Sequence, residues 1–169
     1  WNTKLAEDMW EYKFKDLLMD RIACSTTTPT DWWQGDRYYR KIWNTHGISP
    51  MMRFMKYEKE GQHYAHYDAG YIYPDDNFRT LYSMVIYLTT NQEGGSTRFI
   101  RDGQDTLYAW ERNHEDWTRE ATEDEVICKS EPIKGNVLIF PHRMCHDVEK
   151  YLGDSPRIII RGDIIFNAE

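Results

Sequence analysis

The chain has 169 residues, of which 40% are hydrophobic, and a formal net charge of −7. This length and apolar content can form one sizeable core, so we expect a single domain over residues 1–169. The negative net charge argues against tight binding to a phosphate backbone. No run of apolar residues is long enough to approach a membrane span. We therefore expect neither a nucleic-acid partner nor a membrane.

The three cysteines, Cys24, Cys128 and Cys145, are scattered without the spacing of a metal site. An odd number of dispersed cysteines indicates reduced thiols and therefore a cytoplasmic protein. The chain begins with Trp1 rather than methionine, so we expect the natural N-terminus, with any targeting peptide, to lie upstream. The sequence leaves the oligomeric state open.

The N-terminal part of the chain has helical periodicity. Apolar side chains in residues 4–23 recur close to every 3.6 residues, which predicts an amphipathic helix that covers a sheet. "STTTPTDWWQGDRYYRKIW", residues 25–43, predicts a loop and a second short helix. Residues 1–50 are thus assigned as helical support. Packing against a helix is favoured over a substrate platform for the aromatic residues of this part, Trp32, Trp33, Tyr38, Tyr39 and Trp43.

From Met51 onward, short segments rich in Val, Ile, Tyr and Thr are separated by Gly, Pro and Asn, which is typical of strands. Helices followed by about seven strands predict a mainly β protein, a rolled β-sandwich over residues 51–169 with helices on one face. The predicted strands are residues 51–57, 62–69, 79–90, 96–101, 126–133, 136–140 and 157–166.

An acidic segment interrupts the strands. Residues 102–131 contain ten acidic and three basic residues, whereas the rest of the chain has eighteen of each. We expect a partly helical insert over about residues 102–125 that borders the mouth of the site and favours a cationic or neutral substrate. His114 and Asp116, inside this insert, are assigned to a solvated helical face.

The stretch "GQHYAHYDAG", residues 61–70, carries the first candidate metal ligands. Side chains alternate along a strand, so His66 and Asp68 share one face and His63 takes the other. An imidazole and a carboxylate on one face can bind a single ion. His146 or His142 can supply a third ligand, and two histidines with one carboxylate are typical of a non-haem Fe(II) site with open positions for oxygen chemistry.

Three longer stretches carry a family resemblance. "YEKEGQHYAHYDAG", "RTLYSMVIYLTTNQEGGSTRF" and "PIKGNVLIFPHRMCHDVEKYLGDSPRIIIRGD" resemble, in this order, the motifs of prolyl 4-hydroxylase-like dioxygenases that depend on 2-oxoglutarate and Fe(II). The resemblance covers about residues 53–166 and implies a double-stranded β-helix, the jelly-roll of cupins. Ser96, where the family often has an acid, the longer spacing from His146 to Arg157, and the acidic insert depart from the pattern.

The resemblance also implies site residues. His66, Asp68 and His146 correspond to the iron ligands, and His142 is left as a histidine that lies beside the ligands or on the surface. Arg157 corresponds to the basic residue that pairs with the distal carboxylate of 2-oxoglutarate, and Tyr57 and Tyr87 correspond to hydroxyls near that co-substrate.

Strand parity places Arg161 on the same face as Arg157. We assign Arg157 to 2-oxoglutarate and expect Arg161 to pair with Asp163 or another acid, or to face the substrate. We further expect the strand that begins at Arg157 to run beside the strand that precedes His146.

The implied activity is hydroxylation of an unactivated C–H with release of succinate and CO2. Fe(II), 2-oxoglutarate and O2 are the implied cofactor and co-substrates, and ascorbate stays open as an addition. The substrate is a prolyl residue of a peptide, or else a free amino acid or another small molecule. The alternatives are a dioxygenase that demethylates nucleic acid and a non-catalytic cupin-like binder of a metal or small molecule.

Overall fold

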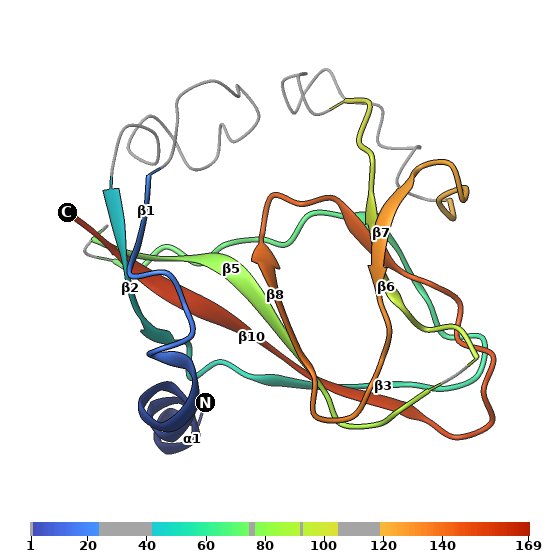
Figure 1. Ribbon diagram of the computed structural model, residues 1–169, viewed down its shortest axis with the longest axis horizontal. Helices are drawn as coiled ribbons and strands as arrows, with labels where there is room; N and C mark the ends of the chain where they lie inside the picture. Colours follow the sequence, from blue (N-terminus) through green and yellow to red (C-terminus); the bar gives the residue numbers. More distant parts are fainter. Residues whose placement is uncertain (1, 24–41, 75–76, 92, 105–118) are drawn as a thin grey trace.

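The computed structural model describes residues 2–23, 42–74, 77–91, 93–104 and 119–169, which form two facing antiparallel sheets and a short helical segment (Figure 1). The helical segment consists of α1, Thr3–Met9, and the π-helix η1, Trp10–Phe14. The strands are β1 (Arg21–Ala23), β2 (Ile42–Ile48), β3 (Arg53–Tyr57), β4 (His63–His66), β5 (Phe78–Tyr87), β6 (Thr97–Ile100), β7 (Val126–Ser130), β8 (Val137–Pro141), β9 (His146–Val148) and β10 (Arg157–Ala168).

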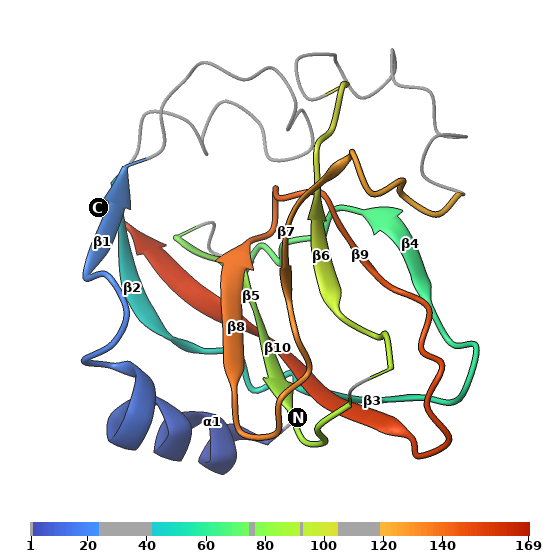
Figure 2. The same ribbon diagram turned by 45° about the vertical axis from the view of Figure 1, so that its right-hand side comes forward.

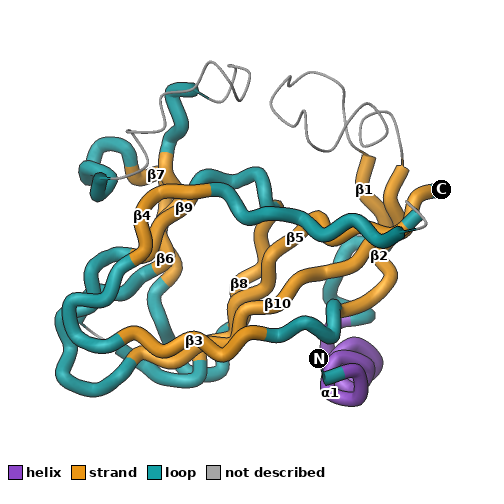
Figure 3. Tube along the Cα trace, turned by 180° about the vertical axis from the view of Figure 1, so that it is seen from behind, coloured by secondary structure: helices purple, strands orange, loops and turns teal. Residues whose placement is uncertain are grey.

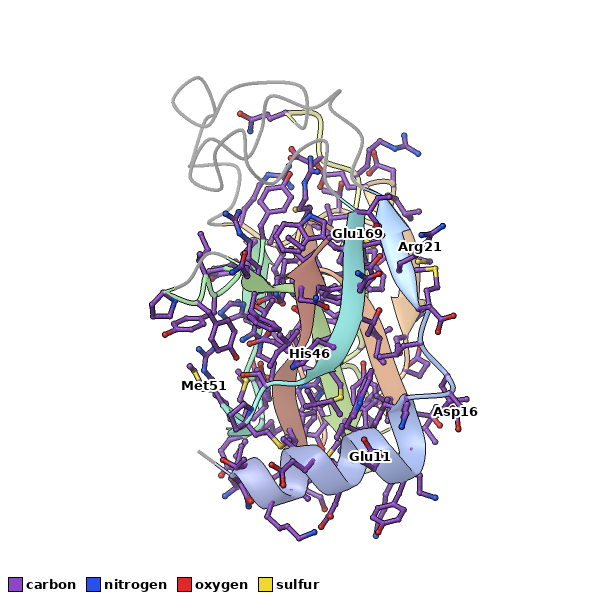
Figure 4. The ribbon with its side chains drawn as sticks, turned by 90° about the vertical axis from the view of Figure 1, so that its left-hand side faces the viewer. Glu11, Asp16, Arg21, His46, Met51 and Glu169 are labelled. Carbon is purple, nitrogen blue, oxygen red and sulfur yellow. The ribbon has the colours of Figure 1, made fainter. Side chains whose placement is uncertain are left out.

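The N-terminal helix is shorter than the sequence predicts. The side chain of Asn2 accepts a hydrogen bond from the backbone N–H of Leu5 and caps the first turn. The backbone N–H of Lys15 reaches the carbonyl of Trp10, five residues earlier, and the helical segment ends there. Figure 4 shows this segment across one end of the strands, with Arg21 and Glu169 toward the opposite end.

Among the described residues of the segment 1–50, which the sequence assigns as helical support, residues 3–14 are helical. Residues 21–23 and 42–48 form β1 and β2, which pair with each other, and β2 also pairs with β10. Strand pairing and burial of Trp43, which is fully buried, override the local helical pattern. Trp32, Trp33, Tyr38, Tyr39 and most of the expected second helix lie outside the described residues.

The larger sheet has the order β1-β2-β10-β5-β8, and β3 joins the same edge of β10 as β2 but farther toward its start. The smaller sheet has the order β4-β9-β6-β7. Figure 2 and Figure 3 show the smaller sheet facing the half of the larger one that contains β3, β5, β8 and the start of β10. This architecture is a double-stranded β-helix, as the sequence predicts.

The long strand β10 separates two parts of the core. On one face, Ile164 and Phe166 pack with Trp43, Met84 and residues of the helical segment. On the other face, Ile159 packs with Val85, Tyr87, Phe99 and Phe140 between the two sheets. The odd-numbered residues from Arg157 to Asp163 therefore point into the space between the sheets.

All seven strands predicted from residue 51 onward are present, with bounds that differ by a few residues. One predicted neighbour is wrong: β8, the strand that precedes His146, pairs with β5, and β5 separates it from β10. No helix among the described residues is long and apolar enough to cross a membrane.

Candidate metal centre

Two histidines meet across neighbouring strands of the smaller sheet. His66 of β4 and His146 of β9 are directly paired in the ladder, and their ring centroids are 4.3 Å apart. The carboxylate oxygens of Asp68 lie 3.8 Å from Nε2 of His66 and 3.6 Å from Nε2 of His146. One ligand atom from each residue fits within a mutual distance of 4.8 Å, close enough to hold one ion. In the described part of the chain, no other group of this kind occurs.

Hydrogen bonds fix which nitrogen of each histidine is available to a metal. Nδ1 of His66 lies 2.7 Å from the carbonyl oxygen of Tyr64, and Nδ1 of His146 lies 2.9 Å from that of Met144. A carbonyl only accepts, so each Nδ1 carries the proton and each Nε2 presents a lone pair toward Asp68. The backbone two residues before each histidine therefore fixes its ring so that Nε2 faces Asp68.

The charge states also suit a metal. Burial lowers the pKa of His66 and of His146, so both rings favour the neutral form that binds metals. Burial alone would raise the pKa of Asp68, but Arg161, His146 and the hydroxyl of Ser83 together bring it below its ordinary value. Two neutral imidazoles and an ionised carboxylate are a donor set that fits Fe(II).

His66 and Asp68 lie close together, as expected, but not because they alternate along one strand. β4 ends at His66, and Asp68 lies beyond that end. The same parity wrongly places His63 on the opposite face. Nδ1 of His63 is 2.9 Å from Nδ1 of His66, and the two rings make an edge contact at 4.1 Å. A register shift between the two residues turns His63 toward the cavity that His66 lines.

The carboxylate of Asp68 also contacts two side chains of the larger sheet. The Ser83 hydroxyl donates a hydrogen bond to Oδ2, and Nη2 of Arg161 lies 3.0 Å from Oδ1. Sequence reasoning missed Ser83, although strand parity places it on the same face as Tyr87. His142 lies outside the metal-binding group, is buried, and contacts Ser83 and Thr80. Burial lowers the pKa of His142 to about 4, so its ring is neutral near pH 7.

Arg157 is fully buried and forms no ion pair with an acid in the described residues. Its guanidinium carbon lies 4.7 Å from the centroid of the Tyr57 ring and 5.6 Å from that of Tyr87. Burial is the main influence on its pKa and lowers it. Burying a cation without an anion is costly, so this pocket is suited to an external carboxylate.

Arg161 has the opposite surroundings. Nη2 of Arg161 lies 3.0 Å from Asp68 and 3.2 Å from Asp163, so two carboxylates flank one guanidinium. The expected pairing with Asp163 is present, and the contact with Asp68 adds a link to the candidate metal ligand. Burial raises the pKa of Asp163 to about 6.

The metal-binding group and Arg157 line one cavity of about 390 Å³ between the two sheets. This volume is within the range of small-molecule sites and leaves room for more than an ion. Its apolar lining includes Met55, Val85, Phe140, Val148 and Ile159. His114, Asp116 and most of the acidic insert lie outside the described residues, so the expected position of the insert stays a prediction.

A family model described as the 2OG-Fe(II) oxygenase superfamily matches residues 52–162. Among solved structures, a Pseudomonas putida prolyl-4-hydroxylase is 19% identical, with a TM-score of 0.45, and the match covers 71% of this chain and 53% of that one. A viral collagen prolyl hydroxylase from Paramecium bursaria Chlorella virus-1 is 17% identical, with a TM-score of 0.45 and coverage of 75% and 58%. An RmlC-like cupin from Desulfovibrio desulfuricans is 12% identical, with a TM-score of 0.33 and coverage of 74% and 82%. No curated protein matches the sequence.

Proposed function

Because the family model matches residues 52–162, the chain belongs to the 2OG-Fe(II) oxygenase superfamily, and we propose that it hydroxylates an unactivated C–H of a small molecule or peptide. In this reaction, one O2 is consumed, 2-oxoglutarate becomes succinate and CO2, and the substrate gains a hydroxyl. The observation that carries the proposal is that one cavity contains both a two-histidine, one-carboxylate group and a buried arginine without an acid partner in the described residues.

We propose His66, Asp68 and His146 as the iron ligands. Bound Fe(II) supplies the activation of O2, which no amino-acid side chain provides. The protein keeps Nε2 of both histidines unprotonated and within 3.8 Å of the Asp68 carboxylate, and it keeps Asp68 ionised. Three protein ligands leave coordination positions open for a co-substrate and oxygen.

We propose Arg157 as the group that binds the distal carboxylate of 2-oxoglutarate. On β10, Arg157 lies four residues before Arg161, which contacts Asp68, so a ligand must extend along the cavity to reach both Arg157 and the metal group. A dicarboxylate has this shape, with one end for the metal and the other for a guanidinium, which can form two parallel hydrogen bonds. The flanking rings of Tyr57 and Tyr87 hold the cation in place.

A peptidyl proline or a free amino acid is the substrate class we propose. The two hydroxylases named above act on prolyl substrates according to their descriptions, but their similarity to this chain establishes no shared substrate. The alternative of a methylated nucleic acid is disfavoured by the net charge of −7.

Formation of succinate tests the proposed activity. Purified protein is incubated with Fe(II), ascorbate as reductant and 2-oxoglutarate, first alone and then with pools of prolyl peptides, amino acids and oligonucleotides. We expect succinate to require iron and to increase with one pool. Failure to produce succinate with any pool, in protein that binds metal, would contradict the proposed reaction.

A further inference from the structure

We propose that His142 is a positioning residue for Asp68, acting through the hydroxyl of Ser83. The inference rests on the proposed role of Asp68 as a metal ligand. His142 itself would touch neither the metal nor the substrate. Its function would be to fix the direction of the carboxylate before the metal arrives.

The contacts form one continuous chain in the interior. Ser83 donates a hydrogen bond to Oδ2 of Asp68, and Oγ of Ser83 lies 2.8 Å from Nδ1 of His142. On the other side of the ring, Nε2 lies 3.2 Å from Oγ1 of Thr80. Ser83, Thr80 and His142 have exposed fractions of 0%, 1% and 2%, so water cannot replace these bonds.

The direction of every hydrogen bond follows from the donors available. The single proton of the Ser83 hydroxyl goes to the ionised carboxylate, so Nδ1 of His142 must donate to Ser83. A neutral ring then has its lone pair on Nε2, which accepts from the hydroxyl of Thr80. Oγ1 of Thr80 in turn accepts the backbone N–H of Tyr71 at 2.7 Å. Each hydrogen bond in this series is therefore donated in the direction from Tyr71 to Asp68.

His142 also holds Asp68 through the backbone. The N–H of Asp68 donates to the carbonyl of His142 at 3.1 Å, and the N–H of His142 donates to the carbonyl of Leu81 at 2.9 Å. Asp68 needs such support because it lies beyond the end of β4, whereas His66 and His146 are held by strand ladders. His142 thus connects Asp68, the proposed ligand that lies outside the strands, to the centre of β5.

A ring that merely fills space would have the same burial but no role in metal binding. Two substitutions separate these possibilities. His142→Leu removes the donor to Ser83, and His142→Asn keeps an amide N–H close to the position of Nδ1. Ser83→Ala breaks the same chain with a smaller change in volume, so it carries the test if His142→Leu does not fold.

The experiment is a calorimetric titration of each apoprotein with Mn(II), which needs no turnover. We expect His142→Leu and Ser83→Ala each to weaken Mn(II) binding by about 10- to 100-fold, which is the usual effect of losing a residue that orients a metal ligand through hydrogen bonds. His142→Asn should keep most of the affinity. The double variant Ser83→Ala with His142→Leu should bind no more weakly than the weaker single variant, because both remove one unit.

Ser96→Ala is the matched control, since Ser96 is a buried serine that donates to a carboxylate, that of Glu131, outside the metal site. It should leave Mn(II) affinity unchanged. Parent-like affinity in folded Ser83→Ala, or additive losses in the double variant, would overturn the positioning role. If the parent binds no Mn(II), or His66→Ala binds it as tightly as the parent, the proposed metal centre itself fails, which is a different result.

Discussion

Arg157 and Arg161 lie four residues apart on the same face of β10, yet their surroundings differ completely. Arg161 is flanked by Asp68 and Asp163, at 3.0 and 3.2 Å. Arg157 is fully buried between Tyr57 and Tyr87 and forms no ion pair with an acid of the described chain. Among the described residues, the charge of Arg161 is thus balanced by two acids, whereas no acid balances the charge of Arg157.

The two surroundings distinguish a charge that stabilises the fold from a charge that is available to a ligand. In a buried ion pair, the attraction between the two charges offsets the cost of removing them from water. Removing one partner leaves the other charge uncompensated. A buried cation with only aromatic neighbours is stabilised in part by the rings and more fully by an anion that arrives from outside. We therefore assign Arg161 to the metal end of the cavity and Arg157 to the co-substrate end.

Substitution of the candidate metal ligands should have the strongest consequences. His66→Ala, Asp68→Ala and His146→Ala should each abolish succinate formation and Mn(II) binding, because two remaining ligands hold the ion poorly. His63→Ala should keep both, although His63 contacts His66. Thermal unfolding of the apoproteins checks that the variants fold. Metal binding that survives His146→Ala but is lost in His142→Ala would show that the distal ligand is the other histidine.

A pH effect on stability is expected next, from His142 at the same end. Its pKa is lowered to about 4, below the ordinary 6.5, so between these values the unfolded chain binds a proton that the folded chain does not. The corresponding stability is present above about pH 6.5 and is lost as the pH falls toward 4, by up to about 3 kcal/mol.

Urea unfolding of the parent and of His142→Asn at pH 7 and pH 5 isolates the contribution of His142, because the opposite contribution of Asp163, whose pKa is raised to about 6, is present in both apoproteins. The asparagine does not titrate, so the variant should lose less stability between the two pH values than the parent. An equal loss in both proteins would mean that His142 is not kept neutral by the fold.

At the co-substrate end, Arg157→Ala should raise the apparent constant for 2-oxoglutarate by about 10-fold or more, the effect of losing a hydrogen bond to a charged group of ~1.5–3 kcal/mol. Arg161→Ala should change this constant less. Mn(II) affinity should stay nearly intact in Arg157→Ala, since Arg157 is absent from the metal-binding group. Steady-state succinate formation at saturating iron measures both constants, and the reverse ranking of the two arginines would contradict the assignment.

The smallest effect is expected from a hydroxyl near Arg157. The Tyr87 hydroxyl donates to Oγ1 of Thr97 at 3.0 Å, which fixes the ring beside the guanidinium. Tyr87→Phe keeps the ring and loses the hydroxyl, with its bond to Thr97 and its longer 3.4 Å contact to Ser130, so we expect a 2-oxoglutarate constant raised by about 2- to 10-fold, from ~0.5–1.5 kcal/mol. A larger effect than that of Arg157→Ala would mean that Tyr87, and not the arginine, is the main contact.

Among the described residues, the sequence predicts seven of the eight strands after residue 51, because alternation and turn residues are local signals, and it misses the three-residue strand β9. It fails for residues 21–23 and 42–48, where pairing with β10 decides the structure and no local pattern reports it. The three candidate ligands were identified mainly through family motifs. Strand parity gave the wrong side for His63, since a register shift in β4 has no clear signature in the residue types.

The contacts around the candidate ligands were harder to predict. The bonds that orient His66 and His146 end on backbone carbonyls, which every residue has. Ser83 and Thr80 look like ordinary strand residues until β5 and the turn at His142 are placed together. The pairing of Arg161 with Asp163 follows from parity, but its contact with Asp68 depends on the packing of one sheet against the other.

We propose above that Arg157 binds the distal carboxylate of 2-oxoglutarate. The most direct test compares 2-oxoglutarate with 2-oxopentanoate, which has the same chain length but no distal carboxylate, by calorimetric titration into Mn(II)-loaded protein. The parent and Arg161→Ala should both prefer 2-oxoglutarate, by about 10-fold or more in the parent, and Arg157→Ala should bind the two acids about equally weakly. A preference that persists in Arg157→Ala, or one that disappears in Arg161→Ala instead, would contradict the assignment.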